Sequence, residues 1–140
     1  MTIKVFKELP KESTFVRETV FVHEQGFNEE FDDIDNISTH IVMFEESEPV
    51  AVCRVYFDDV LNTFVFGRLA VVSSCRGKGL GAQILNYAEK LVEEMGGQSM
   101  ILHAQVRVKQ FYEKQGYSSY GEVDLDEDCP HIWMKKELLQ

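Results

Sequence analysis

Three glycines stand at alternate positions in the middle of the sequence, at Gly77, Gly79 and Gly81. They follow an apolar run with the character of a strand and precede an amphipathic run with the character of a helix. Glycine has no β-carbon, so the backbone N–H groups of such a loop can approach an anion closely, and a helix N-terminus adds partial positive charge. Arg76 and Lys78 add formal positive charge. This spacing predicts a site for a phosphate or pyrophosphate, against the alternative of a flexible loop with an ordinary helix cap.

Two common phosphate loops do not fit this segment. A Walker A loop requires Gly-Lys followed by Ser or Thr, whereas Lys78 is followed by Gly79. A dinucleotide fingerprint that starts at Gly79 requires a third glycine where Ile84 stands, and an acidic residue at the end of the next strand, where Gln105 stands. These departures argue against ATP or NAD as the ligand of the loop.

The acidic residues are concentrated in two segments. The chain carries 24 Asp and Glu against 14 Lys and Arg, for a net charge of −10, which argues against nucleic acid as a partner. Residues 27–37 and 121–129 account for this whole imbalance and contain no Lys or Arg. The segments are either solvated loops that aid solubility, or loops that line one cleft and attract a cationic acceptor. Their acids are Glu29, Glu30, Asp32, Asp33, Asp35, Glu122, Asp124, Asp126, Glu127 and Asp128.

Cysteine and histidine usage indicates a metal-free protein of a reducing compartment. Cys53, Cys75 and Cys129 are odd in number and widely spaced, which predicts free thiols. No set of His, Cys and carboxylate residues has the spacing of a metal site, and the spacing of His23 and His103 indicates no partner for either. No apolar run approaches the ~20 residues of a membrane span, and the N-terminus lacks the apolar region of a signal peptide. We therefore expect a cytoplasmic protein that does not bind membranes.

Apolar periodicity and turn residues predict one mixed α/β domain over residues 1–140. Ser13 is expected to cap the first helix, which Gly26 ends. Residues 64–72 are apolar on both faces, as in a central buried strand. The order is β-α-β-β-β-α-β-α-β-β. The expected strands are residues 4–7, 40–44, 50–57, 64–72, 99–104, 117–120 and 131–136, and the expected helices are residues 13–25, 80–95 and 108–115.

The glycine loop fits the pattern (Gln/Arg)-x-x-Gly-x-(Gly/Ala) through Arg76, Gly79 and Gly81. With the strand Gly67–Val71 before it, Ala104-Gln105 after it and the run Phe111–Tyr117 beyond, the chain resembles the GNAT superfamily of N-acetyltransferases over nearly its whole length. A second set of residues resembles the small bacterial ElaA/YjcF-like branch of that superfamily. This set comprises Val20–Gln25, the first acidic segment, His40 and Pro130-His131-x-x-Met134.

The resemblance implies the acyl-CoA N-acyltransferase fold, a mostly antiparallel sheet with one splayed parallel strand pair, flanked by helices. It also implies acetyl-coenzyme A as co-substrate. Its pyrophosphate would lie on the loop residues Arg76, Gly77, Lys78, Gly79, Leu80, Gly81 and Ala82. Its pantetheine arm would pair with the backbone of Leu69, Ala70 and Val71, and the side chain of Gln105 would contact the same arm.

In this family the residue that matches Tyr112 commonly acts as general acid. When an amine attacks a thioester, coenzyme A leaves as a thiolate; a thiol has a pKa of about 8.5 and a phenol of about 10, so a phenol can stabilise that thiolate. The alternative is a tyrosine packed beside Phe111. The amine must also lose a proton, for which the candidates are Glu24, Asp35, His40 and His131, each of which could instead be structural.

The resulting hypothesis is direct transfer of an acetyl group to a primary amine, by Tyr112 with Glu24 or His131. Asp32, Asp33, Asp35 and His40 would bind a cationic acceptor, either a small molecule or a peptide. The alternative is a non-catalytic acetyl-coenzyme A sensor or assembly module, and a homodimer is left open.

Overall fold

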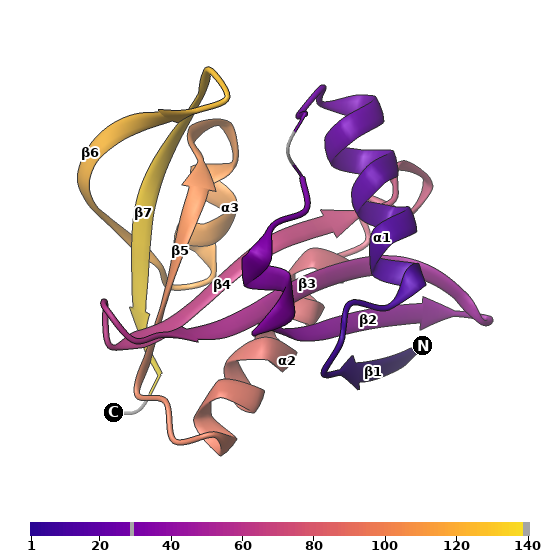
Figure 1. The fold of residues 1–140 in the computed structure, drawn as a ribbon, viewed down its shortest axis with the longest axis horizontal. Helices are drawn as coiled ribbons and strands as arrows, with labels where there is room; N and C mark the ends of the chain where they lie inside the picture. The colour runs from indigo at the N-terminus through magenta and orange to yellow at the C-terminus, as the bar shows by residue number, and fades with distance from the viewer. Residues whose placement is uncertain (29, 139–140) are drawn as a thin grey trace.

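Seven strands form one sheet in the computed structural model, which describes residues 1–28 and 30–138 (Figure 1). The strands are β1 (Thr2–Phe6), β2 (Thr39–Glu45), β3 (Glu48–Asp58), β4 (Thr63–Val71), β5 (Ser99–Gln105), β6 (Ser118–Asp126) and β7 (Cys129–Glu137). Their spatial order is β1-β2-β3-β4-β5-β7-β6, and every neighbouring pair is antiparallel except β4 and β5. The predicted order of strands and helices is therefore confirmed.

Three α-helices of the described residues accompany the sheet: α1 (Lys11–Arg17), α2 (Leu80–Glu94) and α3 (Lys109–Lys114). A π-helix over Glu18–Glu24 directly continues α1. The prediction that Ser13 caps this helix is wrong, because the helix begins earlier, with Pro10 at the N-cap and its carbonyl accepting from the N–H of Thr14. No helix in the described residues is long and apolar enough to cross a bilayer.

Alternation along the strands gives the sheet two apolar faces. On one face, Val16 and Val20 of the first helix pack in a cluster that includes Val42 of β2. On the other face, Ile84 of α2 packs in a cluster that includes Ile41, the neighbour of Val42. Successive side chains of a strand point to opposite faces, so the helices cover both sides of β2 and β3. This double cover explains why the central strands are apolar throughout.

β4 and β5 pair over a short distance and then separate. The parallel ladder consists of Phe64–Met100, Val65–Ile101 and Phe66–Leu102. Beyond Phe66, β5 turns away with β7 and β6, and the two halves of the sheet diverge (Figure 1). β4 also contains a bulge, since Val52 lies opposite Ala70 while Arg54 lies opposite Gly67. The splayed parallel pair expected from the sequence is thus present.

The second acidic segment is a strand and its turn. β6 continues to Asp126, and the turn to β7 contains Glu127 and Asp128, both with positive φ. The prediction that the strand stops at Tyr120 is wrong, because the acids there alternate with Val123 and Leu125 in a strand period. β6 is the outer strand of its sheet, where charged side chains are typical.

Candidate active site

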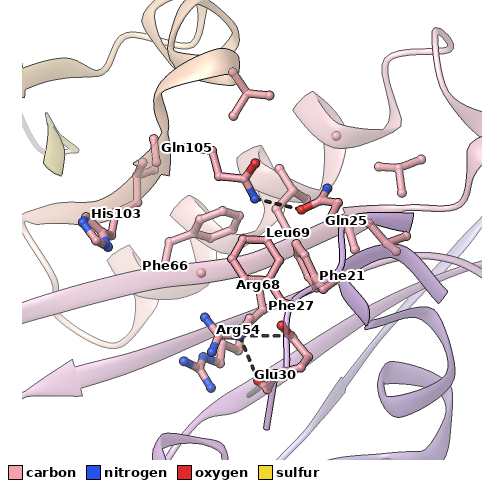
Figure 2. A pocket seen from close by; sticks show the side chains of 18 of the residues that line it. Phe21, Gln25, Phe27, Glu30, Arg54, Phe66, Arg68, Leu69, His103 and Gln105 are labelled. Carbon is pink, nitrogen blue, oxygen red and sulfur yellow. Dashed lines mark hydrogen bonds and ion pairs between the residues drawn. The ribbon is translucent and has the colours of Figure 1, made fainter. Parts of the chain in front are cut away.

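A cleft of about 1460 Å³ opens where β4 and β5 separate (Figure 2). Its walls come from the π-helix and the segment after it, from β3, β4, β5 and β7, and from the glycine loop and α3. Ligand sites are usually clefts lined mostly by apolar side chains with a few polar groups. This cleft exceeds the usual volume of about 300–1,000 Å³, so it has room for a large ligand and a second molecule.

The glycine loop forms one end of the cleft. Gly77 and Gly79 have φ of 80° and 79°, in the left-handed region that favours glycine, and Gly79 is the N-cap of α2. Within the described chain, the backbone N–H groups from Gly77 to Ala82 donate to no protein acceptor. A β-carbon at Gly77 or Gly79 would meet nothing within 4 Å. These free donors at a helix N-terminus fit a pyrophosphate.

The two basic residues of the loop are placed differently. Arg76 is occupied: its Nε donates to the carbonyl of Val71 at 2.9 Å, and its two terminal nitrogens bind the carboxylate of Glu24 at 2.9 and 3.0 Å. Lys78 lies outside the lining of the cleft. Arg76 lines the cleft but its charge is paired with Glu24, so the unbonded amides of the loop are its main free groups for an anion.

Leu69, Ala70 and Val71 line the next part of the cleft, where β4 has left β5. Gln105 lies opposite, at the end of β5, and its side chain crosses to the first helix (Figure 2). Its Nε2 donates to Oε1 of Gln25 at 2.9 Å, and its Oε1 accepts from Nε of Arg107 at 2.7 Å. Both functional atoms of Gln105 are thus already engaged with protein groups.

Tyr112 lies on α3, in the wall of the cleft, and is 8% exposed. Its ring contacts Phe111 and Tyr117 edge to face, with centroid distances of 5.0 and 6.0 Å. Burial raises the pKa of Tyr112, and the nearby Cys53 adds to this effect. The phenol therefore keeps its proton at neutral pH and can serve as a hydrogen-bond donor. Its packing against two rings also fits the structural alternative.

Three arginines pair with three acids of the first acidic segment. Arg17 binds Glu30 at 2.9 Å and Asp35 at 2.7 Å, Arg54 binds Asp35 at 2.9 Å, and Arg68 binds Glu30 at 3.0 Å. Asp32 completes this ion cluster through Arg54 at 2.8 Å. The arginines come from α1, β3 and β4, and sequence reasoning missed them. The signal was a charged residue inside an apolar strand, which a buried position tolerates only with a partner.

The ion cluster determines the pKa values of its carboxylates. Burial raises the pKa of Asp35, but hydrogen bonds and charges from Arg17 and Arg54 outweigh burial and lower it to about 2. Burial dominates for Glu30, whose pKa is raised although Arg68 and Arg17 act against that shift. Because Asp35 carries two guanidinium partners, we assign it a firmly ionised state.

This arrangement separates the predicted acceptor residues. Asp32 lines the cleft, whereas Asp33, Asp35 and His40 do not. His40 is fully buried, its Nε2 lies 2.9 Å from the carbonyl of Asp35, and burial lowers its pKa. Since the described part of the ion cluster has three carboxylates and three guanidinium groups, it adds no net negative charge to the wall. Glu29 lies outside the described residues.

Two histidines line the far end of the cleft, beside the β6–β7 hairpin. His131 is 6% exposed, and its Nδ1 donates to the carbonyl of Cys129 at 2.8 Å. His103 stacks on Trp133, and its Nε2 lies 2.7 Å from Oδ1 of Asp124. The expectation that His103 lacks a partner is thus wrong, because strand pairing brings Asp124 to it. The ring centroids of His103 and His131 are 4.7 Å apart.

A sheet that splits beyond one short parallel ladder, with a glycine loop and a helix N-terminus at the open end, is the architecture of the acyl-CoA N-acyltransferase class. The chain matches the acetyltransferase (GNAT) domain family over residues 7–138 and belongs to that family. It is 36% identical to the uncharacterized N-acetyltransferase YjcF of Bacillus subtilis over 94% of each chain. It is 31% identical to ElaA of Escherichia coli, over 89% of this chain and 85% of that one.

Solved structures agree. The crystal structure of E. coli ElaA superposes with a TM-score of 0.85 and 28% identity, covering 97% of this chain and 99% of that one. An acyl-CoA N-acyltransferase from Pseudomonas aeruginosa superposes with a TM-score of 0.84 and 26% identity, covering 96% and 98%. The predicted superfamily, ElaA/YjcF-like branch and fold are confirmed, and the protein is an acyltransferase enzyme.

Proposed function

We propose that this acetyltransferase moves the acetyl group of acetyl-coenzyme A directly to a primary amine, with Tyr112 assisting the leaving thiolate. The observation that carries the proposal is the row of free backbone donors at Gly77–Ala82, which opens into a cleft that also contains Tyr112. The donors suit a pyrophosphate and the rest of the cleft suits a long ligand arm. The coenzyme supplies the activated acyl thioester.

The chain's own groups position the ligand. The loop amides bind negative charge at the N-terminus of α2. Beyond Phe66, the edge of β4 that faces away from β3 has no strand partner among the described residues, so the backbone of Leu69–Val71 can pair with an amide-containing arm as a further strand would. Arg76 holds the loop in position, because its guanidinium group binds both the carbonyl of Val71 and the carboxylate of Glu24.

Tyr112 acts mainly as a hydrogen-bond donor. Its pKa is raised by burial, so full proton transfer to a thiolate, whose thiol has a pKa of about 8.5, is uphill. Donation of a hydrogen bond to a developing negative charge still lowers the barrier. The thiolate can then take its proton from solvent after it leaves.

His131 is the better placed of the two candidate bases. With its Nδ1–H bound to the Cys129 carbonyl, the lone pair of the neutral ring is on Nε2, and the side chain lines the cleft. Glu24 also lines the cleft, but both of its carboxylate oxygens bind Arg76. We therefore assign proton removal from the amine to His131 and positioning of the loop to Glu24.

The acceptor is cationic, and the β6–β7 hairpin attracts it. Asp126 lines the cleft there, and so does Glu127, whose Oε1 accepts from the backbone N–H of Asn28 at 2.8 Å. The acids of the first segment that line the cleft, Glu30 and Asp32, are paired with arginine. The hairpin carries five acids over residues 121–129 and no Lys or Arg. Negative potential at the entrance of a cleft raises the local concentration of a cation.

Replacement of Tyr112 by Phe tests the catalytic role. With a panel of a polyamine, an amino sugar and a lysine peptide, release of free coenzyme A thiol identifies the acceptor that wild type uses. On that acceptor, kcat of Tyr112→Phe should fall by roughly 10²–10³, the usual effect of losing one donor to a developing negative charge, while the KM for acetyl-coenzyme A stays unchanged. The matched control is Tyr87→Phe, a half-exposed tyrosine of α2 outside the cleft lining. A Tyr112→Phe rate within twofold of wild type would make Tyr112 a packing residue.

A further inference from the structure

Three neighbouring strands bring two histidines and a carboxylate together at the hairpin end of the cleft. In the sheet, His103 of β5 pairs with Trp133 of β7, and Asp126 of β6 pairs with Cys129 of β7. His131 is two residues from each of these β7 partners, so all three side chains stand on one face of the sheet. One ligand atom from each of His103, Asp126 and His131 lies within 4.8 Å of the other two.

Both histidines are already oriented as metal ligands usually are. A ligating histidine typically donates its second ring N–H to a carboxylate or a carbonyl, which fixes the ring and the tautomer. His131 does so to the Cys129 carbonyl at 2.8 Å, and His103 does so to Asp124 at 2.7 Å. The lone pairs that remain are on Nε2 of His131 and Nδ1 of His103. Only 6% of His131 is exposed, so the surrounding side chains hold its ring in place in the wall of the cleft.

We propose that His103, Asp126 and His131 bind a divalent zinc ion at the acceptor end of the cleft. Two imidazoles and one carboxylate are a recurrent zinc ligand set, with the fourth position left to water. Tetrahedral zinc holds its ligand atoms about 3.4 Å apart, with bonds of about 2.0–2.2 Å, so separations within 4.8 Å need to shorten by at most about 1.4 Å on binding. Asp126 supplies the needed freedom, since it is exposed and lies next to the turn at Glu127.

The electrostatic surroundings favour a dication at this place. Glu122, Asp124 and Asp128 add negative charge on the same hairpin as Asp126. The other charged part of the cleft, the ion cluster around Arg54, has its acidic and basic side chains paired with one another. A zinc ion would therefore neutralise charge that the described residues leave unpaired at Asp126.

Zinc at this site regulates the enzyme as an inhibitor. This consequence, unlike the binding itself, rests on the proposed function: zinc occupies the His131 lone pair that would take the proton of the amine. Zinc binding and turnover then exclude one another. Kinetically, zinc lowers the apparent kcat/KM for the amine and leaves the KM for acetyl-coenzyme A unchanged.

Calorimetric titration of chelator-treated, full-length protein with ZnCl₂ tests the binding. We expect one zinc per chain for wild type, and an affinity at least tenfold weaker for His103→Gln and for His131→Gln. Asp124→Asn changes no ligand, and should weaken zinc by about 10–100-fold by releasing His103. His23→Gln and Cys129→Ser are matched controls that should bind as wild type does. Circular dichroism verifies that each variant is folded.

The visible absorption of bound Co²⁺ gives a second readout that does not depend on activity. It should be intense and tetrahedral in type for wild type, and absent for His131→Gln. The proposal is overturned if wild type binds zinc no more tightly than His131→Gln, or if Cys129→Ser removes binding. If zinc binds as expected but no amine is acetylated, the proposed function fails and the metal site stands. If turnover is observed and zinc does not bind, the metal site fails alone.

Discussion

Glu24 and Arg76 are 52 positions apart in the chain and form a two-point ion pair, with both carboxylate oxygens on the two terminal guanidinium nitrogens at 2.9 and 3.0 Å. The pair connects the C-terminal end of the π-helix to the glycine loop. Because Arg76 also donates to the carbonyl of Val71, one side chain fixes the loop to the first helix and to β4. Because both carboxylate oxygens of Glu24 are bound to Arg76, the ion pair favours a role for Glu24 in supporting the loop over a role as base for the amine.

Glu24→Gln should raise the KM for acetyl-coenzyme A by about two- to fivefold and leave kcat within twofold. The pair is partly exposed, at 44% and 35% for the two side chains, so its loss costs at most about 1 kcal/mol. Steady-state kinetics with varied acetyl-coenzyme A provide the measurement. Arg76→Gln should have an effect at least as large, because it also removes the bond to the Val71 carbonyl, and the double variant should be no worse than Arg76→Gln alone. A fall in kcat at unchanged KM would instead make Glu24 the base.

Gly79→Ala should weaken coenzyme A binding at least tenfold. Alanine at φ of 79° is strained by roughly 1–2 kcal/mol, and relief of that strain turns the free amides away from their common direction. Calorimetry with coenzyme A measures the effect. Gly96→Ala is the matched control, since Gly96 has φ of 90° but lies beyond the far end of α2. It should lose similar stability and bind normally; equal loss of binding in both variants would point to general destabilisation.

Asp35→Asn should destabilise the fold by about 3 kcal/mol or more at pH 7, because it leaves Arg17 and Arg54 short of a buried partner. The pKa of Asp35 is lowered from 3.8 to about 2, so its stabilisation is complete well above 3.8 and is lost as pH falls toward 2. Urea unfolding should therefore show a wild-type advantage that shrinks by about 1 kcal/mol between pH 7 and pH 3.

Asp33→Asn is the control for this experiment. Asp33 is exposed and belongs to the same segment, so its replacement should change the free energy of unfolding by less than about 0.5 kcal/mol at either pH. The raised pKa of Glu30 gives the unfolding free energy a pH dependence of opposite sign. Wild type and Asp35→Asn share this contribution, so most of it cancels when the two proteins are compared. A pH-independent deficit for Asp35→Asn would mean that packing, and not charge, explains its effect.

Asp126→Asn should raise the KM for a cationic amine by about two- to fivefold at low salt, and added salt should remove the difference. The assay contains a chelator, so that no metal contributes. Asp59→Asn, at an exposed acid outside the cleft lining, should leave the KM unchanged. If both variants alter the KM equally, the net charge of the protein and not the hairpin attracts the amine.

The sequence was sufficient for the order of strands and helices, because long apolar runs and the glycines that end them are local signals. It was also sufficient for the glycine loop, whose residues are adjacent in the chain. The ion cluster could not be predicted from the sequence. Asp35 is 18 positions from Arg17 and 19 from Arg54, and these contacts depend on how the first helix packs on β3. The same holds for His103 and Asp124, which only the order β5-β7-β6 brings together.

The bounds of β6 were predicted wrongly because the acidic composition of residues 121–129 indicated a loop, whereas their alternation of polar and apolar residues indicated a strand. Five acids in residues 121–129 have the composition of a loop, yet β6 extends to Asp126 because an outer strand tolerates charge. In the first segment the acids read as exposed because no basic residue is near them in the chain. Their partners are Arg17 of α1 together with Arg54 and Arg68, which stand in the otherwise apolar strands β3 and β4.

The short ladder between β4 and β5 has a thermodynamic consequence. Three residue pairs join the two halves of the sheet, so a ligand arm laid along the free edge of β4 contributes main-chain bonds that the folded chain alone does not make. Such a ligand binds only the folded state, and mass action then stabilises the protein by RT ln(1 + [L]/Kd), about 2.7 kcal/mol at a hundredfold excess over Kd. The population of unfolded chains available to a protease falls about a hundredfold under the same conditions. We therefore expect the lifetime of this enzyme to depend on the supply of the coenzyme proposed to bind along β4.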